Sequence, residues 1–598
     1  MGKQRYELKW DLDCFFPGGS ASPQFEHFVS DLSRRMDELK RDIMKLAKLN
    51  PANPDRWHET LTRAQEATSR LYQANAFVSC LTAQDVKDEK AKLWRGRLTQ
   101  LGAAYRAAMT AMDDALLNVP DSDWTVLLQD ERLQPIAFFL EERRQHAKER
   151  LSPEMETLAG DLSVDGYHAW GQLYNTVVGR MQIPLEEKGK TVHLSVGQAS
   201  NRLSHPDRRV RQSTFAALEK AWSQEAELCA ASLNHLAGYR LNLYRHRGWN
   251  SVLKEPLDDN RMSAETLETM WQVIEKNKPR LIYYMDRKAL LLGVDALSWY
   301  DLSAPLPGEE KQIPYDEAAD FITEQFGHFD PEMAKFARHA FENRWIEAED
   351  RPGKRPGGFC TSFKLSRQSR IFMTYAGTAS NVSTLAHELG HAYHQYVMND
   401  LPEFAQQYAM NVAETASTFA ELIVTDAAIR HASSDKEKLK LVEDKLQRAV
   451  AFFMDIHARF LFETRFYERR KQGPVSVEEL NALMLQAQKD GFHHALNVYH
   501  PYMWASKLHF YITGAPFYNF PYTFGYLFST GIYARALAEG PSFARKYVAL
   551  LRDTGRMTVE DLARKHLGVD LTQPEFWQSA VDTVLEDVDL FLELTETK

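Results

Sequence analysis

The chain has 598 residues, of which 44% are hydrophobic and 26% are charged, close to the average for soluble globular proteins. At about 150 residues per domain, this length excludes a single small fold. The formal net charge is −10, from 72 basic and 82 acidic residues. Because the chain has no dense Lys/Arg run to neutralise phosphates, nucleic acid is not an expected partner.

The cysteines and the hydropathy pattern indicate a cellular compartment. Cys14, Cys80, Cys229 and Cys360 are far apart and form no CxxC pair, so they provide neither a disulfide framework nor a thiolate zinc cluster. The first residues are polar where a signal peptide would be apolar, and no apolar run reaches the roughly 18 residues of a membrane span. We therefore expect a cytoplasmic protein with no membrane partner.

Amphipathic helices are predicted along most of the chain. From Phe25 to Leu46, apolar residues recur at steps of three and four, which places them on one face of a helix. Similar patterns recur at residues 56–118, 133–160, 207–247, 263–292, 434–470 and 540–596. No period of about 34 or 40 residues is present, so a repeat solenoid is not expected. The predicted fold class is mainly α.

Two segments interrupt the helical pattern. Residues 301–316 contain three prolines, and residues 351–377 contain Gly and Pro clusters followed by two short β-prone runs. Phe359–Phe363 and Arg370–Tyr375 are predicted to pair as strands of a small sheet. An exposed edge of that sheet could bind the backbone of an extended peptide. Taken alone, these residues are equally consistent with a surface hairpin that binds nothing.

A metal-binding pattern follows directly after the predicted strands. The chain reads His387-Glu388-Leu-Gly-His391, inside a segment predicted as one helix that begins with the capping residues Ser380 and Asn381. Histidines at i and i+4 lie on the same face of a helix, so His387 and His391 can bind one zinc ion. Glu388 is offset from that face and can instead act on a water molecule.

A catalytic zinc ion needs a third protein ligand and an open coordination position. His394 lies two turns beyond His387, and a metal held between His387 and His391 would be about one further turn away from it along a straight helix. His394 is therefore expected to be a neighbour of the site. The metzincin pattern is excluded, because it needs glycine where this chain has His394 and histidine where it has Val397.

Glu414 is the predicted third ligand. It lies in a second helical pattern from Phe404 to Ile429, after a stretch long enough for a turn and an antiparallel return. Glu421 falls two helical turns later on the same face, where it could orient a ligand imidazole. A surface glutamate without such a role is equally consistent with the sequence.

Several longer segments resemble one enzyme family. The segments are TLAHELGHAYH at 384–394, NVAETASTFAE at 411–421, HFYITGAPFYNFPYTFGYLFS at 509–529, WDLDCFFPG at 10–18 and YDLSAPL at 300–306. Together they resemble the oligoendopeptidase F branch of the thimet-oligopeptidase-like zinc metallopeptidases. The resemblance implies that His387, His391 and Glu414 bind zinc and that Glu388 is the general base.

The resemblance also implies residues that bind the substrate. In that family a histidine and tyrosines bind the substrate and stabilise the oxyanion, and His509, Tyr518 and Tyr522 are the matching residues. This chain is a few residues longer between His509 and Tyr518 than the commoner family pattern. Without the family, Tyr511, Tyr518, Tyr522 and Tyr526 would be interpreted as core or wall aromatics.

The architecture implied by the resemblance is a large, two-lobed helical metallopeptidase that encloses a deep substrate channel. The small β-sheet is expected beside the HExxH helix, the N-terminal helical lobe at residues 1–200 and the catalytic region at residues 201–598. A narrow channel would admit unfolded oligopeptides and exclude folded proteins. No oligomeric state is indicated.

The expected activity is that of an endopeptidase with one zinc ion (Zn2+) per chain, hydrolysing internal bonds of short, unfolded oligopeptides. A helical zinc carboxypeptidase is the alternative within this class. It would need a cationic group that binds the C-terminal carboxylate of the substrate, and no residue of the sequence identifies one. A non-catalytic zinc-binding scaffold is less favoured, because structural zinc sites normally have four protein ligands, and the sequence indicates three.

Overall fold

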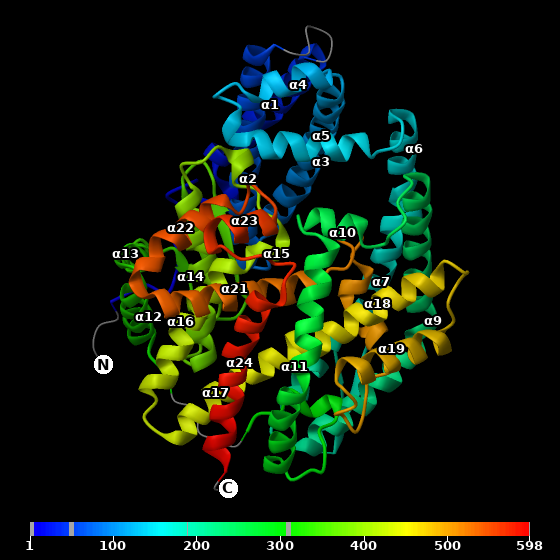
Figure 1. Ribbon diagram of the computed structural model, residues 1–598, viewed down its shortest axis with the longest axis vertical. Coiled ribbons are helices and arrows are strands. Elements are labelled where there is room, and N and C mark those ends of the chain that lie inside the picture. Colours follow the sequence, from blue (N-terminus) through cyan, green and yellow to red (C-terminus); the bar gives the residue numbers. More distant parts are fainter. Residues whose placement is uncertain (1–4, 47–52, 188, 307–311, 597–598) are drawn as a thin grey trace. The chain divides into compact units, whose positions relative to one another are not determined.

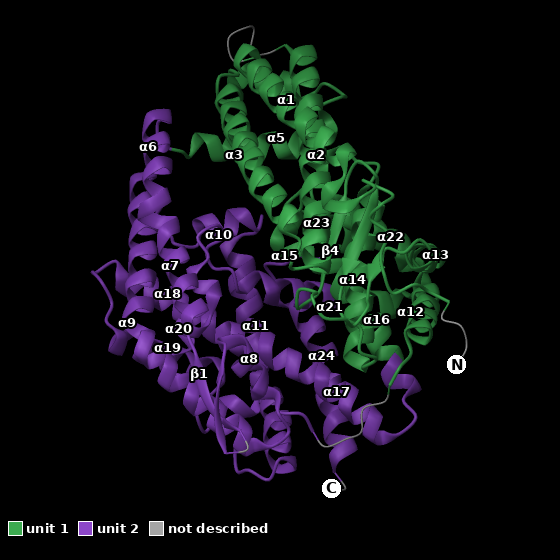
Figure 2. Ribbon diagram, turned by 180° about the vertical axis from the view of Figure 1, so that it is seen from behind, with its two compact units in different colours: residues 1–150, 310–427, 535–568 green, residues 151–309, 428–534, 569–598 purple. Residues whose placement is uncertain are grey.

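The computed structural model describes residues 5–46, 53–187, 189–306 and 312–596. Within these ranges the chain is mainly helical (Figure 1), which confirms the predicted fold class. The chain divides into two compact units of three segments each (Figure 2). Unit 1 is Met1–Arg150, Glu310–Ala427 and Arg535–Gly568, and unit 2 is Leu151–Glu309, Ala428–Ala534 and Val569–Lys598. The lobe boundary expected at residue 200 stays a prediction.

The first segment of unit 1 is a group of helices. They are α1 (Pro23–Leu46), α2 (Pro54–Gln84), α3 (Glu89–Leu117), α4 (Asp121–Leu128) and α5 (Ala137–Lys148). The apolar stripe predicted for α1 is buried, and it includes Phe25, Leu32 and Ile43. The hydrophobic core of these helices continues to Phe363 and Phe372, which belong to the sheet of the same unit. The helices therefore support the sheet that lies beside the candidate site.

The remaining elements of unit 1 build the site. They are α12 (Tyr315–Phe329), α13 (Pro331–Glu342), β3 (Ile346–Glu347), β4 (Phe359–Phe363), β5 (Gln368–Phe372), α14 (Ala379–Met398), α15 (Met410–Ala413), α16 (Thr415–His431), α22 (Ala544–Asp553) and α23 (Val559–Leu567). Helix α16 continues past Ala427 into unit 2. The segment predicted to break the helical pattern at 301–316 contains no α-helix before α12 among its described residues, and 307–311 lie outside them.

The three-stranded sheet has the order β3-β5-β4. Strand β4 pairs antiparallel with β5, with Cys360 opposite Ile371, and β3 pairs parallel with β5, with Ile346 opposite Ile371. The structure confirms β4 over the predicted residues. Strand β5 overlaps the predicted Arg370–Tyr375, but it begins at Gln368 and ends at Phe372. Strand β3 was not predicted, because two residues are too few to show a periodicity. Helix α14 packs on β4 and β5, which confirms a small sheet beside the HExxH helix.

Unit 2 is built mainly from helices. They are α6 (Pro153–Ser163), α7 (Ala169–Arg180), α8 (Val196–Asn201), α9 (Arg208–His246), α10 (Lys254–Asp259), α11 (Ala264–Leu291), α17 (Asp435–Val450), α18 (Ile456–Arg470), α19 (Val477–Gly491), α20 (Met503–Ser506), α21 (Phe520–Glu539), whose last turns belong to unit 1, and α24 (Pro574–Thr595). An antiparallel pair, β1 (Ile183–Glu187) and β2 (Lys190–Leu194), was not predicted. No described helix combines the length and the apolar character needed to cross a membrane.

The backbones of α14 and α16 approach each other closely at Gly390. A Cβ atom added at this position would lie 2.5 Å from the carbonyl oxygen of Ala416 and 2.6 Å from the Cα atom of Ser417. Both are backbone atoms, so no side-chain rotation can relieve the clash. Glycine is thus required where the HExxH helix crosses the start of α16.

We predict that Gly390→Ala lowers the stability of the protein. Overpacking of this kind destabilises by roughly 1–3 kcal/mol, and urea unfolding should show a lower midpoint. Gly96→Ala is the matched control, because Gly96 lies inside α3 with nothing within 4 Å of an added Cβ atom. Alanine there should stabilise by up to about 1 kcal/mol through helix propensity. Equal midpoints for Gly390→Ala and the unmodified chain would contradict the steric argument.

Candidate metal centre

Helix α14 begins at a capping box. The Thr378 hydroxyl accepts a hydrogen bond from the backbone N–H of Asn381 (3.1 Å), and the Asn381 side chain accepts one from the backbone N–H of Thr378 (3.3 Å). The predicted start at Ser380 is therefore two residues too late. The preceding Gly377 has a φ of 82°, a turn conformation that glycine adopts without strain and that leads the chain from the sheet into the helix.

His387, His391 and Glu414 converge on one point of unit 1. The Nε2 atoms of His387 and His391 lie 3.2 Å and 3.4 Å from the same oxygen, Oε2 of Glu414. One ligand atom from each residue lies within 4.8 Å of the other two. The two imidazole rings are nearly perpendicular, with centroids 4.9 Å apart. The three side chains that meet in the structure are the three that the sequence analysis named as candidate ligands.

The spacing of these atoms suits zinc. Zinc bonds to histidine nitrogen and carboxylate oxygen are about 2.0–2.2 Å long, and tetrahedral angles then place two ligand atoms about 3.4 Å apart. The two nitrogen–oxygen distances of 3.2 Å and 3.4 Å match this separation. Three protein ligands also leave one tetrahedral position for a water molecule or a substrate.

The charges of the group also suit a cation. Burial lowers the pKa of His387, but hydrogen bonds to Glu414 and Glu421 outweigh that effect and raise this pKa to about 10. Burial raises the pKa of Glu414, but its hydrogen bonds to His387 and His391 bring that pKa far below its ordinary value. The carboxylates thus create a strong preference for positive charge between them, which a metal ion meets by displacing the proton.

Glu414 does not lie inside a helix, contrary to the prediction of one helix from Phe404 to Ile429. Glu414 is the C-cap residue that follows α15, and it directly precedes α16. Phe404 instead lies in a short 3-10 turn, Glu403–Ala405, and its ring stacks on Phe139 of α5 with centroids 4.1 Å apart. The Ser417 hydroxyl donates a hydrogen bond of 2.8 Å to Oε2 of Glu414. No pattern in the sequence singles out Ser417.

Glu421 lies on the other side of His387. Its Oε2 atom is 3.2 Å from Nδ1 of His387, and the residue is 6% exposed. Of the two alternatives that the sequence left open, this geometry fits the orienting carboxylate. A hydrogen bond from Nδ1–H to a carboxylate keeps Nε2 unprotonated and turned towards a metal.

Glu388 is buried, and at least one oxygen of its carboxylate has no hydrogen-bond partner in the described part of the chain. It is 7% exposed, and its Oε2 atom has no hydrogen-bond partner among the described residues. A Cβ atom at Gly358, just before β4, would lie 3.5 Å from Oε1 of Glu388, so the missing side chain leaves room beside the carboxylate. Burial raises the pKa of Glu388, and the positive charges of His391 and His387 oppose the rise.

His394 makes different contacts from the two histidines before it. It is fully buried, its Nε2 atom lies 2.9 Å from the hydroxyl of Thr554, and its ring stacks on Tyr408 with centroids 4.4 Å apart. Burial lowers the pKa of His394 to about 3. These contacts account for a neutral core histidine.

His509, Tyr518 and Tyr522 form a cluster in unit 2. The ring of His509 has its centroid 5.5 Å from that of Tyr518 and 6.5 Å from that of Tyr522. Burial, together with the cations Arg459 and Lys507, lowers the pKa of His509 to about 4, so its imidazole is neutral near pH 7.

The other two tyrosines of this segment are core residues. Tyr511 is buried and stacks on Tyr174 with centroids 3.6 Å apart, and Tyr526 is buried and stacks on Phe452 at 4.6 Å. Tyr518 and Tyr522 are only half-buried. The structure therefore distinguishes two buried core tyrosines from two half-buried ones, a distinction that the sequence pattern could not make.

Comparison with known proteins places the chain among peptidases. Oligopeptidase PepF of Bacillus subtilis is 24% identical over 606 residues, covering 98% of this chain and 87% of that protein. Group B oligopeptidase PepB of Streptococcus agalactiae is 25% identical over 586 residues, covering 96% and 95%. The crystal structure of oligoendopeptidase-F from Enterococcus faecium shares the fold, with a TM-score of 0.71 at 19% identity over 96% of this chain and 99% of that one.

Two family models match the sequence. The oligopeptidase F model matches residues 116–183, and the model of peptidase family M3 matches residues 202–583. The second match includes every residue of the candidate metal centre and of the His509 cluster. It spans more than half of the chain, which therefore belongs to peptidase family M3.

Proposed function

We propose that this peptidase is a zinc-dependent endopeptidase that hydrolyses internal bonds of short, unfolded oligopeptides. The observation that carries the proposal is the convergence of His387, His391 and Glu414 at zinc-ligand spacing, with the unpartnered carboxylate of Glu388 on the same helix. The names of the relatives, which are oligopeptidases, support oligopeptides as the substrate class.

Each residue of the group has a separate task in this proposal. His387 and His391 would hold the zinc ion through Nε2, and Glu414 would hold it through a carboxylate oxygen. When bound, zinc supplies a Lewis acid that polarises the scissile carbonyl and lowers the pKa of a water molecule. Glu388 accepts the proton of the attacking water and passes it to the leaving amine. Glu421 keeps the His387 ring oriented.

The substrate needs positioning and charge stabilisation as well. Strand β4 is an edge of the three-stranded sheet among the described residues, so its outer side can hydrogen-bond an extended peptide backbone. The hydroxyls of Tyr518 and Tyr522 would donate hydrogen bonds to the oxyanion that forms in the transition state. His509, neutral near pH 7, would bind the substrate as an uncharged hydrogen-bonding group.

We also propose that the enzyme works in the cytoplasm. All four cysteines are free thiols in the structure, as a reducing compartment requires. A non-catalytic zinc scaffold is less favoured, because the described residues supply three ligands to the group and structural sites normally have four.

The first prediction from the proposed function concerns Glu388 and tests that function. The unmodified enzyme should cleave a hexapeptide that is acetylated at one end and amidated at the other, which marks an endopeptidase. Glu388→Gln keeps the shape of the side chain but cannot accept a proton, so kcat should fall by about 100-fold or more. Zinc content, measured by metal analysis, should not change.

The matched control for that experiment is Glu342→Gln, because Glu342 lies exposed on α13 in the same unit. It should keep full activity. Near-normal turnover of Glu388→Gln would remove Glu388 from the mechanism, and an unmodified enzyme that leaves the blocked hexapeptide intact would contradict the endopeptidase proposal.

The second prediction concerns the third zinc ligand. Glu414→Ala should lose most of its zinc on dialysis against a weak chelator, because two histidines alone bind zinc too weakly to retain it. His394→Ala should retain its zinc, because His394 bonds to Thr554 instead. The measurement is the molar ratio of zinc to folded protein after dialysis. The reverse pattern would assign the ligand role to His394.

The third prediction concerns the two half-buried tyrosines. A hydroxyl that meets only the oxyanion lowers the barrier without tightening substrate binding. At least one of Tyr518→Phe and Tyr522→Phe should therefore reduce kcat by roughly 100-fold with little change in KM. Tyr511→Phe is the control, because the buried Tyr511 hydroxyl has no hydrogen-bond partner to lose. Unchanged kcat in both test variants would make these tyrosines packing residues.

A further inference from the structure

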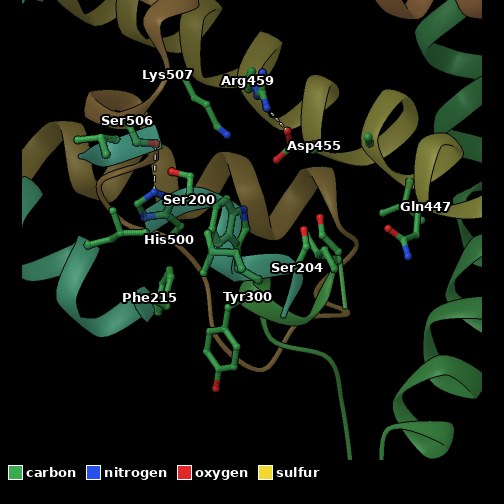
Figure 3. A pocket seen from close by; sticks show the side chains of 18 of the residues that line it. Ser200, Ser204, Phe215, Tyr300, Gln447, Asp455, Arg459, His500, Ser506 and Lys507 are labelled. Atoms are coloured by element: carbon green, nitrogen blue, oxygen red, sulfur yellow. Dashed lines mark hydrogen bonds and ion pairs between the residues drawn. The ribbon is translucent and has the colours of Figure 1, made fainter. Parts of the chain in front are cut away.

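A cavity lies within unit 2, with a volume of about 360 Å³. Part of its wall is apolar and includes Phe215, Leu218 and Trp222. Four serine residues add hydroxyl groups to the lining: Ser200, Ser204, Ser303 and Ser506. Figure 3 shows this cavity with its charged side chains. The combination of apolar wall and hydroxyls suits a ligand that has both an apolar and a polar part.

Lys507 brings into this cavity a charge that no described carboxylate pairs with. Its ammonium group extends towards the middle of the cavity (Figure 3), 5.5 Å from the centre of the Trp299 ring. It donates no hydrogen bond to any described residue and forms no ion pair with one. Burial, aided by the nearby Arg459, lowers the pKa of Lys507 to about 8. A ligand that supplies negative charge would stabilise the ammonium group in this position.

The one acidic residue of the lining, Asp455, pairs with a cation other than Lys507. Asp455 forms an ion pair with Arg459, one helical turn along the chain, and Arg459 also donates to Oδ1 of Asn519 at 3.1 Å. His500, the remaining titratable residue of the lining, pairs with Glu219 outside it. The lining thus has one positive charge in excess, that of Lys507.

Two further donors of the lining also lack acceptors. The Nε atom of Arg459 and the indole Nε1 atom of Trp299 are buried and have no hydrogen-bond partner among the described residues. Buried N–H groups without acceptors are rare in native structures, because each costs about 1–3 kcal/mol. An excess of donors together with one net positive charge is the complement of a singly charged acceptor, such as a carboxylate.

The surroundings of the cavity connect it to the substrate. Lys507 precedes His509 by two residues, and Asn519, which binds Arg459, directly follows Tyr518. One carboxylate attached to an apolar side chain, next to residues proposed to bind a peptide, corresponds to the C-terminal residue of that peptide. A phosphate dianion would call for more than one unpaired cation.

We propose that this cavity, which we call the Lys507 pocket, binds the C-terminal carboxylate of the peptide substrate through Lys507. The proposal rests on the proposed peptidase function and adds to it a preference for oligopeptides with a free C-terminus. It also supplies a cationic group that the sequence pattern did not identify. The pocket selects among oligopeptides, while Glu388 and the metal ligands carry out the hydrolysis.

The first arm of the test uses the unmodified holoenzyme. Two peptides of the same sequence, with an apolar last residue, differ only in a free C-terminal carboxylate or a C-terminal amide. The ratio of kcat/KM for the acid to that for the amide should be about tenfold or more, as expected for a charge-assisted hydrogen bond. A ratio near one would overturn the proposal without any variant.

The second arm uses variants at the pocket. Lys507→Met keeps the length and the apolar stem of the side chain but removes the charge, so the acid-to-amide ratio should fall towards one, mainly through a higher KM for the acid. Lys507→Arg should retain most of the preference. Lys220→Met, an exposed lysine on α9 of the same unit, should leave the ratio unchanged. A ratio in Lys507→Met equal to that of the unmodified enzyme would contradict the assignment.

A binding measurement separates failure of this proposal from failure of the peptidase function. If neither peptide is cleaved, the proposed function fails, and calorimetric titration with the same two peptides still tests the pocket. Binding of the acid about tenfold tighter than the amide, lost in Lys507→Met, supports the pocket. Equal affinities for the two peptides overturn it.

Discussion

The contact between the backbones of α14 and α16 at Gly390 is the constraint on which the metal group depends. Carbonyl oxygen and Cα atoms of α16 lie where a side chain of α14 would begin, so the two helices are closer than any other residue would permit. His387 and His391 come from one partner of this contact, and Glu414 immediately precedes the other. A shift of a few tenths of an ångström would already move the carboxylate relative to both imidazoles, because packed interiors transmit strain.

Electrostatics explains why such precision is needed. Two imidazoles and two carboxylates are brought together at partly buried positions, which is unfavourable unless each charge finds a partner. Ser417 satisfies one lone pair of Glu414, and Glu421 satisfies Nδ1 of His387. What remains is a set of nitrogen and oxygen atoms that lie within 4.8 Å of one another, a group that could hold a metal ion in place of a proton. The helices bring these atoms together, and the hydrogen bonds fix the orientation of the Glu414 carboxylate and the His387 ring.

The sequence predicted those parts of the site that depend on local periodicity. The i, i+4 spacing placed His387 and His391 on one face of a helix, and β-prone composition located β4 correctly. It failed for the helix expected from Phe404 to Ile429: Phe404 lies in a short 3-10 turn and packs against Phe139, a residue distant in sequence, and the helix begins again only at Met410. Ser417 could not be predicted, since one serine has no pattern. Lys507 likewise stands in no motif, and only the three-dimensional lining shows that the nearby acid is already paired with Arg459.

Glu388 and Lys507 each carry a charged group that the described residues leave incompletely satisfied. Oε2 of the buried Glu388 has no hydrogen-bond partner among them, and the partly buried Lys507 forms no side-chain hydrogen bond or ion pair with a described residue. Leaving such a group unpaired reduces stability, and a molecule other than the protein can complete the contact. In the proposed function, the molecule at Glu388 is a water to be deprotonated, and in the proposed Lys507 pocket it is a carboxylate to be held. On these two proposals, unsatisfied charge marks both where this peptidase reacts with its substrate and where it selects it.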